Sequence, residues 1–366
     1  MAYEFRLDLS KANGEKFDEV TDFIDLACSV RVNEPGAMSF VLPGNHTAAY
    51  LLEERSQLDL YYRDLEAGLA WTKFFGGIYL GQRREYSGQS RFVGSAMGYL
   101  WMLGTRIVAY SANKTGRSKY VNVAGETVMK SLVQYNVTAA ATTLNGRLRN
   151  GTAWPSNVIT IESTQHRGNT TTWYAAQDNV LESLIDLAKI AGGDYDLVKN
   201  QGAFQFRFYP GQLGTDRTST VVFSLEHGNM GSAVYKRSRV SEATVAIVGG
   251  QGDEAAREFV VRTGADYNSM SDVEVFAPAT HIEQGNVNGL NAAGDKKLVD
   301  TRAPAVFEFD IIQTPSSRFG LHYFLGDKAS AVNPYTQATL VQKVVAADAV
   351  LSTGNPPEIK VYAETP

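Results

Sequence analysis

The chain has 366 residues and a mass of 40.0 kDa, with 34 basic and 39 acidic side chains and a formal net charge of −5. This balance excludes a protein that grips nucleic acid by neutralising phosphates, which needs a basic surface. Cys28 is the only cysteine, which excludes a disulfide framework and argues against a Cys-based zinc site. The sequence contains no run of about 18 apolar residues and no signal-peptide pattern at its start, so we expect synthesis in a reducing cytoplasm and protein partners.

Residues 1–110 form a succession of short runs with strand character. Strands are predicted at 3–9, 22–32, 39–42, 57–62, 72–85 and 91–96, separated by turns such as Asn13-Gly14 and the Pro-Gly pairs at 35–36 and 43–44. Gly76-Gly77, inside a long apolar strand, indicates a bulge or a sharp barrel corner. The spacing predicts a first β-barrel domain over 1–110.

Residues 111–215 change to a helical period. Apolar side chains recur at intervals of three and four residues in 124–135 and 180–191, which predicts two amphipathic helices. The second helix has a capping pattern of Asn179 and Glu182 and ends at Gly192-Gly193. A hairpin over 195–209 follows, and we expect a small α/β domain over 111–215.

The strand pattern returns in the last third of the chain. Strands are predicted at 221–225, 233–239, 243–248, 321–332, 337–346 and 358–363. We expect a second β-barrel domain over 216–250 and 301–366, interrupted by an inserted subdomain over 251–300 with a short helix at 291–299. The predicted fold is therefore mainly β with α+β insertions: two related β-barrel domains, a small α/β domain and an inserted subdomain.

A glycine-rich loop at 249–252 superficially resembles a phosphate-binding loop. The Walker pattern ends in Lys-Ser/Thr, which reaches the phosphates and magnesium, whereas Asp253-Glu254 would place two negative charges there. Glycine's first role is conformational, so the loop is interpreted as a turn between a strand and the insertion.

Metal-binding patterns are also incomplete. The five histidines are isolated in sequence, at His46, His166, His227, His281 and His322. His281-Ile282-Glu283 resembles the His-x-Glu of zinc deaminases, but the Pro-Cys-x-x-Cys partner cannot exist with one cysteine. Asp194-Tyr195-Asp196, with Asn200 and Gly202, resembles the start of a calcium loop. An EF-hand needs glycine at position six and glutamate at twelve, where this chain has Lys199 and Gln205, so a hairpin with a polar turn is favoured.

The basic groups are Arg83-Arg84, Arg147/Arg149 and Lys236-Arg237/Arg239. Each is interpreted as a solvated face or an intersubunit ion pair rather than a nucleic-acid contact. The Gly-x-Ser-x-Gly elbow of serine hydrolases does not occur, and sequence cannot place paired carboxylates across a cleft. The sequence therefore predicts no catalytic, cofactor-binding or metal-binding residues.

Several stretches, taken in order, form a pattern. In the first predicted barrel and the helix that follows they are "VNEPGAMSFVLPGN", "LLEERSQLDLYYRD", "FFGGIYLGQRREYSG", "YLWMLGTRIV" and "TVMKSLVQYNV". In the second predicted barrel they are "AIVGGQGDEAAREFV", "KKLVDTRA" and "FGLHYFLGDKASAV". Together these stretches resemble the tail-hub (tail-tip or baseplate-hub) proteins of long-tailed bacteriophages.

This resemblance implies a homotrimer in which each subunit contributes two related barrels. The resulting ring of six would join the hexameric tail tube to threefold tip or baseplate structures and leave a channel for DNA. The implied partners are the tail tube or distal tail protein, central fibre or tip proteins and the tape measure protein, while DNA passes without specific binding. The protein would reside in the virion and be made in the host cytoplasm.

Some hub relatives carry a C-terminal peptidase or cell-wall hydrolase. This chain ends at Pro366, just after the last predicted strand, so we expect no such extension and no enzymatic activity. Two alternatives are a glycan-binding (receptor-binding) virion protein, because aromatic side chains stack on sugars, and a polysaccharide hydrolase with two carboxylates across a cleft.

Overall fold

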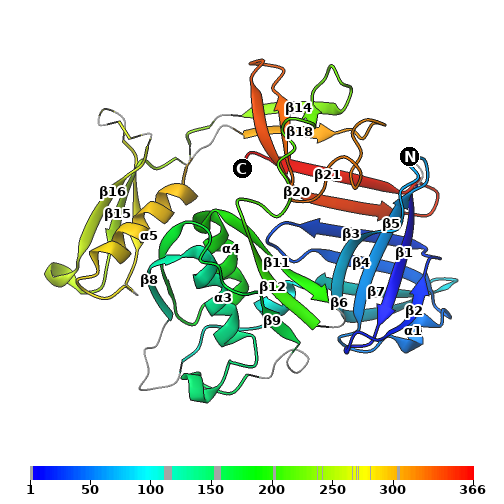
Figure 1. Ribbon diagram of the computed structural model, residues 1–366, viewed down its shortest axis with the longest axis horizontal. Coiled ribbons are helices and arrows are strands. Elements are labelled where there is room, and N and C mark those ends of the chain that lie inside the picture. The colour runs from blue at the N-terminus through cyan, green and yellow to red at the C-terminus, as the bar shows by residue number, and fades with distance from the viewer. Residues whose placement is uncertain are drawn as a thin grey trace.

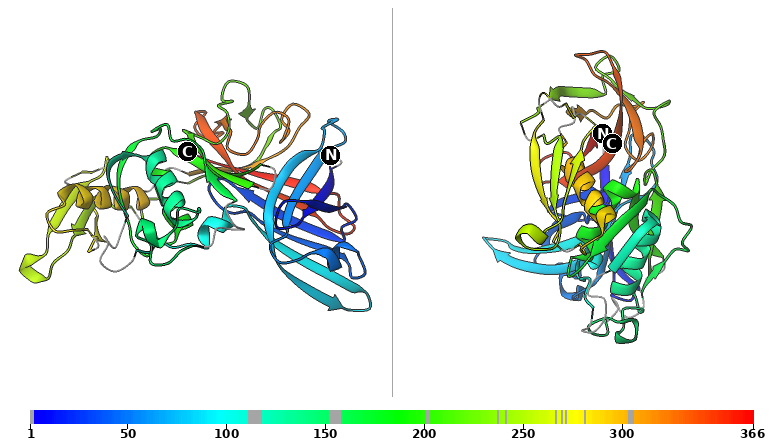
Figure 2. Two further views of the ribbon diagram at one scale, coloured as in Figure 1. Left: turned by 60° about the horizontal axis from the view of Figure 1, so that its bottom comes forward. Right: turned by 90° about the vertical axis from the view of Figure 1, so that its left-hand side faces the viewer.

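The computed structural model is mainly β and describes residues 3–110, 118–151, 158–200, 203–236, 238–240, 242–265, 267–268, 270, 272–280, 282–302 and 306–366. A large central sheet lies at one end of the molecule, an α/β unit lies beside it, and a small three-stranded sheet lies at the far end (Figure 1; Figure 2). No helix among the described residues has the length and apolar character needed to cross a membrane.

The central sheet contains eleven strands from both ends of the chain. In spatial order they are β13 (Val222–Phe223), β19 (Lys328–Val332), β20 (Thr339–Leu351), β3 (Asp25–Arg31), β4 (Ala37–Pro43), β7 (Ser90–Gly98), β6 (Thr72–Tyr86), β5 (Gln57–Asp64), β1 (Tyr3–Ser10) and β2 (Lys16–Val20), with β21 (Glu358–Glu364) paired to β20. Two short helices, α1 (Ala48–Leu51) and α2 (Trp101–Gly104), lie in the connections. Alternate side chains of β1 are buried in the core of this sheet, as the period of two predicts.

The N-terminal and C-terminal strands are joined by the antiparallel pairing of β3 with β20, in which Cys28 lies opposite Ala349. Both strands present small or apolar side chains to the core at this point.

The predicted β-rich fold is confirmed, but the two predicted barrels are not. Among the described residues no sheet closes on itself: β2 and β13 are the two ends of the central sheet and do not pair with each other. Strand spacing predicts strands and turns, whereas closure depends on which distant strands pair, and here β3 pairs with a strand more than 300 residues later.

The α/β unit contains the helices and the hairpin that the sequence predicts. Its elements are β8 (Ser118–Ala124), α3 (Gly125–Asn136), the 3₁₀ helix η1 (Thr143–Asn145), β9 (Ile159–Ile161), β10 (Thr170–Ala175), α4 (Val180–Ala191), β11 (Gly193–Asn200) and β12 (Ala203–Pro210). Asn179 caps α4 by accepting hydrogen bonds from the amides of Leu181 and Glu182. Gly192 ends the helix with a φ of 66°, which glycine adopts without strain. These predictions are confirmed.

The region between β13 and β19 contributes two further sheets. One is the pair β14 (Met230–Lys236) and β18 (Val306–Ile311); the other has the order β16 (Phe259–Thr263), β15 (Val245–Gly249) and β17 (Glu274–Pro278), with the 3₁₀ helix η2 (Glu254–Ala256) in a connection. Helix α5 (Val287–Asp300) covers one face of the second sheet and begins earlier than predicted, because Asn286 accepts a hydrogen bond from the amide of Gly289. The strand predicted at 243–248 is β15, the middle strand of this inserted sheet.

Candidate functional site

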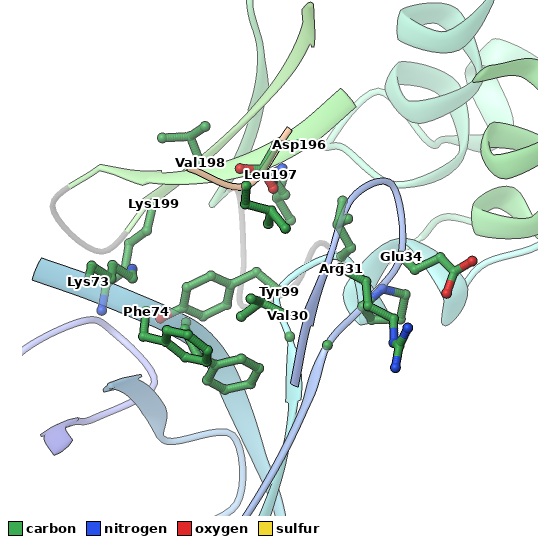
Figure 3. A pocket seen from close by; sticks show the side chains of 17 residues that line it. Val30, Arg31, Glu34, Lys73, Phe74, Tyr99, Asp196, Leu197, Val198 and Lys199 are labelled. Carbon is green, nitrogen blue, oxygen red and sulfur yellow. Dashed lines mark hydrogen bonds between the residues drawn. The ribbon is translucent and has the colours of Figure 1, made fainter. Parts of the chain in front are cut away.

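The principal candidate site is the junction between the central sheet and β11 of the α/β unit. A cavity of about 380 Å³ lies there, between residues 30–36, β6, the end of β7 with the two residues that follow it, and β11 (Figure 3). Its charged and hydroxylated wall residues are Arg31, Glu34, Lys73, Tyr99, Asp196 and Lys199. This size falls in the range of small-molecule pockets, so the chemistry of its wall decides what it can do.

A buried carboxylate, Asp59, organises one side of the cavity. Lys73 donates to its Oδ1 at 2.6 Å, Lys199 to its Oδ2 at 2.6 Å, and the hydroxyl of Tyr99 to Oδ1 at 2.9 Å. Burial alone would raise the pKa of Asp59, but the two ammonium groups outweigh it and lower that pKa. Burial and the nearby Asp59 raise the pKa of Tyr99 well above its ordinary value. Asp59 is therefore an ionised anchor that ties β5, β6 and β11 together.

A second carboxylate, Asp194, organises the other side of the junction. Its Oδ1 accepts hydrogen bonds from the Asn33 amide at 2.8 Å and from Lys343 at 2.6 Å, and its Oδ2 accepts from the backbone amide of Leu213 at 2.6 Å. Asn33 has a φ of 63°, which asparagine tolerates better than most residues. It also accepts hydrogen bonds from the backbone amide and the hydroxyl of Tyr195. Three distant parts of the chain thus meet at one carboxylate.

Asp196, two residues after Asp194 in β11, lies on the cavity wall (Figure 3). Its carboxylate accepts a hydrogen bond of 2.7 Å from the amide of Leu197, and burial raises its pKa despite the opposing charges of Lys73 and Arg207. The described cavity wall contains no serine, threonine, cysteine or histidine. Its two lysines, Lys73 and Lys199, are both paired with Asp59 behind the wall, which is the arrangement of a structural junction between units.

The glycine-rich loop at 249–252 forms a turn after β15. The amide of Gly250 donates to the carbonyl of Glu258, and Gly252 has a φ of 113°, which favours glycine. The carbonyl of Gly249 accepts a hydrogen bond from the amide of Ala279. These backbone contacts account for the glycines in conformational terms.

The histidines and acidic residues singled out in the sequence do not come together as a metal site among the described residues. Within the described ranges, no group of three or more His, Cys, Asp or Glu side chains could hold a metal ion. His46 lies beside Asp22, His166 beside Thr127, His227 beside the carbonyl of Val222 and His322 beside the amide of Arg318, while His281 lies outside the described residues. Asp194 and Asp196 lie in the predicted hairpin, whose turn residue Gly202 is also outside the described residues.

The basic groups lie in separate places. Arg83 pairs with Glu85 at 2.6 Å and Lys236 with Glu308 at 2.7 Å, and Arg239 pairs with Glu242. Arg84 lies over the ring of Tyr50, and Arg147 donates to the carbonyl of Ile107 at 2.8 Å beside the exposed Arg149. Arg237 lies outside the described residues.

Sequence reasoning missed both anchors of the junction. Lys199 lies 140 residues from Asp59, and Asp194 lies 161 residues from Asn33, so no local spacing connects them. The one available signal was Asn33 itself, a residue that tolerates positive φ, placed between a strand and a Pro-Gly turn.

Comparisons with known proteins agree with a phage tail fold. The tail protein from Neisseria meningitidis MC58 is 11% identical, with a TM-score of 0.59 over 100% of this chain and 96% of that chain. The 43 kDa tail protein of prophage MuSo2 from Shewanella oneidensis is 8% identical, with a TM-score of 0.58 over 100% and 98%. A chain of the Francisella PdpA-VgrG complex is 11% identical, with a TM-score of 0.54 over 99% of this chain and 58% of that chain. No curated protein matches the chain.

These likenesses show the fold, and a family model extends them to the sequence. The model for Siphovirus ReqiPepy6 Gp37-like proteins matches residues 16–362, which is nearly the whole chain. The resemblance to phage tail proteins is thereby confirmed, and the chain belongs to the family of Siphovirus ReqiPepy6 Gp37-like proteins.

Proposed function

We propose that three copies of this chain form the hub ring of a phage tail tip. The ring joins the hexameric tail tube to threefold tip or baseplate structures and leaves a channel through which DNA passes without specific binding. The observation that carries the proposal is the match of residues 16–362 to a siphovirus family, together with the phage tail fold.

The architecture supports this role through the β3–β20 pairing. One continuous sheet holds the N-terminal and C-terminal β regions in a fixed relative position. A head-to-tail ring closes by rotation, so three copies with two β regions each can present six surfaces to a sixfold partner. The ends of the sheet, β2 and β13, are strand edges that neighbours in a ring would cover.

The proposed partners are the tail tube or distal tail protein, central fibre or tip proteins and the tape measure protein. The protein resides in the virion after synthesis in the host cytoplasm. The solved structure of a similar chain is a complex of VgrG with PdpA, which supports a role in a larger assembly. The net charge of −5 suits a conduit that DNA must pass, because a weakly acidic chain has no excess of basic groups to neutralise phosphates.

We also propose that the chain acts by assembly and not by catalysis. The test is a cell-wall degradation assay with the purified chain, in which reproducible release of wall fragments would overturn this part of the proposal.

The surroundings of Trp71, a half-buried aromatic side chain at the central sheet, argue against the glycan-binding alternative. The guanidinium groups of Arg6 and Arg63 lie 5.0 and 4.7 Å from its ring centroid and occupy ring surface that a sugar would need.

The decisive experiment for the ring is the native mass of the purified chain over a range of concentrations. A species near about 120 kDa, three times 40.0 kDa, is expected for closed threefold symmetry. A strict monomer at the highest concentration, also in the presence of purified tail tube protein, would overturn the proposal of a trimer.

A further inference from the structure

The inserted sheet of β16, β15 and β17 has two unlike faces. On one face, Val248 and Ala277 are buried against Leu290 of α5. On the other face, Val261 lies opposite Ile247, which lies beside Phe276, so the three side chains point the same way. Val261 is 61% exposed and Phe276 is 48% exposed. Phe259, further along β16, belongs to the same face and is 55% exposed.

The aromatic side chains of this face are held in fixed positions. A Cβ atom at Gly249 would lie 2.6 Å from the ring of Phe276, so that ring rests directly on the glycine. The guanidinium of Arg257 lies 5.6 Å from the ring centroid of Phe259 and 5.4 Å from that of Phe276. The face is therefore a preorganised apolar platform, and little rotamer entropy remains to be lost when it is covered.

An open sheet face normally carries polar side chains, and a contiguous apolar patch marks an interaction surface. At about half exposure, Phe259, Val261 and Phe276 offer roughly 300 Å² of apolar surface. A stable interface buries about 800 Å² on each partner. The face is thus too small to hold an independent protein alone, and it fits a contact between molecules that are already joined elsewhere.

The insert is attached to its own subunit by Tyr174 of β10, which packs against the insert's apolar core, and by two exposed ion pairs. Lys119 pairs with Glu283 at 3.0 Å and Lys296 with Asp186 at 3.1 Å, and all four side chains are at least about one third exposed. Ion pairs of this kind contribute little and weaken in salt.

We propose that the face formed by Phe259, Val261 and Phe276 packs against a second copy of this chain. The proposal rests on the trimer of the proposed function and assigns the inserted sheet a place in its subunit interface. The occupant is a second copy because only molecules already held together would make so small an apolar contact stable.

The first test places the photocrosslinker p-benzoylphenylalanine at position 261 of the full chain and mixes ¹⁴N- and ¹⁵N-labelled protein. Cross-linked peptides that combine the two labels are expected, with a matched control at Leu148, which is 64% exposed on the α/β unit. A chain that reaches about 120 kDa, yet cross-links at 261 only within one copy, would overturn this inference and leave the trimer standing. A wild-type chain that never reaches that mass overturns the trimer itself.

The second test uses Val261→Asp, with Leu148→Asp as the control. Because Val261 is mostly exposed, the variant should fold normally, which circular dichroism checks. Its trimer dissociation constant is expected to rise at least about tenfold, since a carboxylate would be buried without a partner. An unchanged dissociation constant would contradict the inference, and Phe259→Asp provides an independent second variant on the same face.

Discussion

The side-chain amide of Asn33 donates a hydrogen bond of 2.8 Å to Oδ1 of Asp194, which lies in a different unit of the fold. Lys343, in β20, donates to the same oxygen at 2.6 Å. Asp194 is 2% exposed, and its partners come from the loop after β3, from β20 and from the segment after β12. One buried carboxylate therefore couples the α/β unit to both halves of the central sheet.

Replacing Asp194 should loosen this coupling. In Asp194→Asn the charge is lost while the shape is kept, and Lys343, whose side chain is only 14% exposed, remains a partly buried ammonium without its counter-charge. The free energy of unfolding, measured with urea, is expected to fall by about 3 kcal/mol. The control is Glu15→Gln in the exposed pair with Lys11, where a much smaller change is expected because solvent screens the pair. Equal losses in the two variants would contradict the role of Asp194.

Glu126 should make the stability of the α/β unit depend on pH. Its side chain is fully buried in α3, and burial alone would raise its pKa. Hydrogen bonds from Arg167 and Lys130 outweigh that effect and lower the pKa from 4.5 to about 2. Because the unfolded chain binds this proton more readily, the stabilisation is present above about pH 4.5 and is lost as the pH falls through about 2.

Urea midpoints between pH 7 and pH 2.5 test this linkage in the wild-type chain and in Glu126→Gln. The variant is expected to be less stable at pH 7, because Lys130 and Arg167 lose a charged partner. It should also lose less stability than the wild type as the pH falls below 4.5. Parallel pH profiles for the two proteins would contradict the assignment to Glu126.

Local signals predicted the elements that local contacts stabilise. Helix α4 is confirmed at both ends because Asn179 and Gly192 act on the backbone next to them. Helices α1 and α2 were not predicted, because four residues are too few to show a helical period. The pairing of distant strands and the two carboxylate anchors could not be predicted, since β3 meets β20 and Asp59 meets Lys199 only after the chain has folded.

The prediction for Gly76-Gly77, within one strand, also failed to identify contacts with distant residues. The sequence predicted a bulge or corner at these glycines, but the register shifts lie on either side, leaving Phe74 and Leu80 as the extra residues of β6. The glycines instead provide space. A Cβ atom at Gly76 would lie 2.5 Å from the ring of Tyr99 and 2.9 Å from Oδ1 of Asp59. The sequence pattern indicated that these glycines have a structural role. It did not indicate that the distant side chains of Tyr99 and Asp59 need the space at Gly76.

Gly76→Ala is therefore expected to disturb the Asp59 anchor. The added methyl group must displace the Tyr99 ring, whose hydroxyl donates to Asp59, and overpacking of this kind costs about 1–3 kcal/mol. Gly81→Ala is the matched control in the same strand, because its Cβ would meet only Ser95, at 3.5 Å. Thermal unfolding of both variants measures the difference, and equal midpoints would show that the space at Gly76 is not needed.

Asp196→Asn should stabilise the protein at neutral pH. Burial raises the pKa of Asp196 in the folded chain, so the carboxyl is most favourable when protonated, below its unfolded pKa. Its stabilisation is lost as the pH rises through the folded pKa, because an ionised group then remains buried. An asparagine side chain keeps an oxygen for the amide of Leu197 and carries no charge. The variant should unfold at a higher urea concentration than the wild type at pH 7, with the gain in stability shrinking toward pH 4.

Asp59→Asn is the matched control and should have the opposite effect, because the lysines lower the pKa of Asp59 and its charge is stabilising. If Asp196→Asn were less stable at pH 7, the attraction of Lys73 and Arg207 would outweigh the cost of burial, and Asp196 would be a third ionic anchor of the junction.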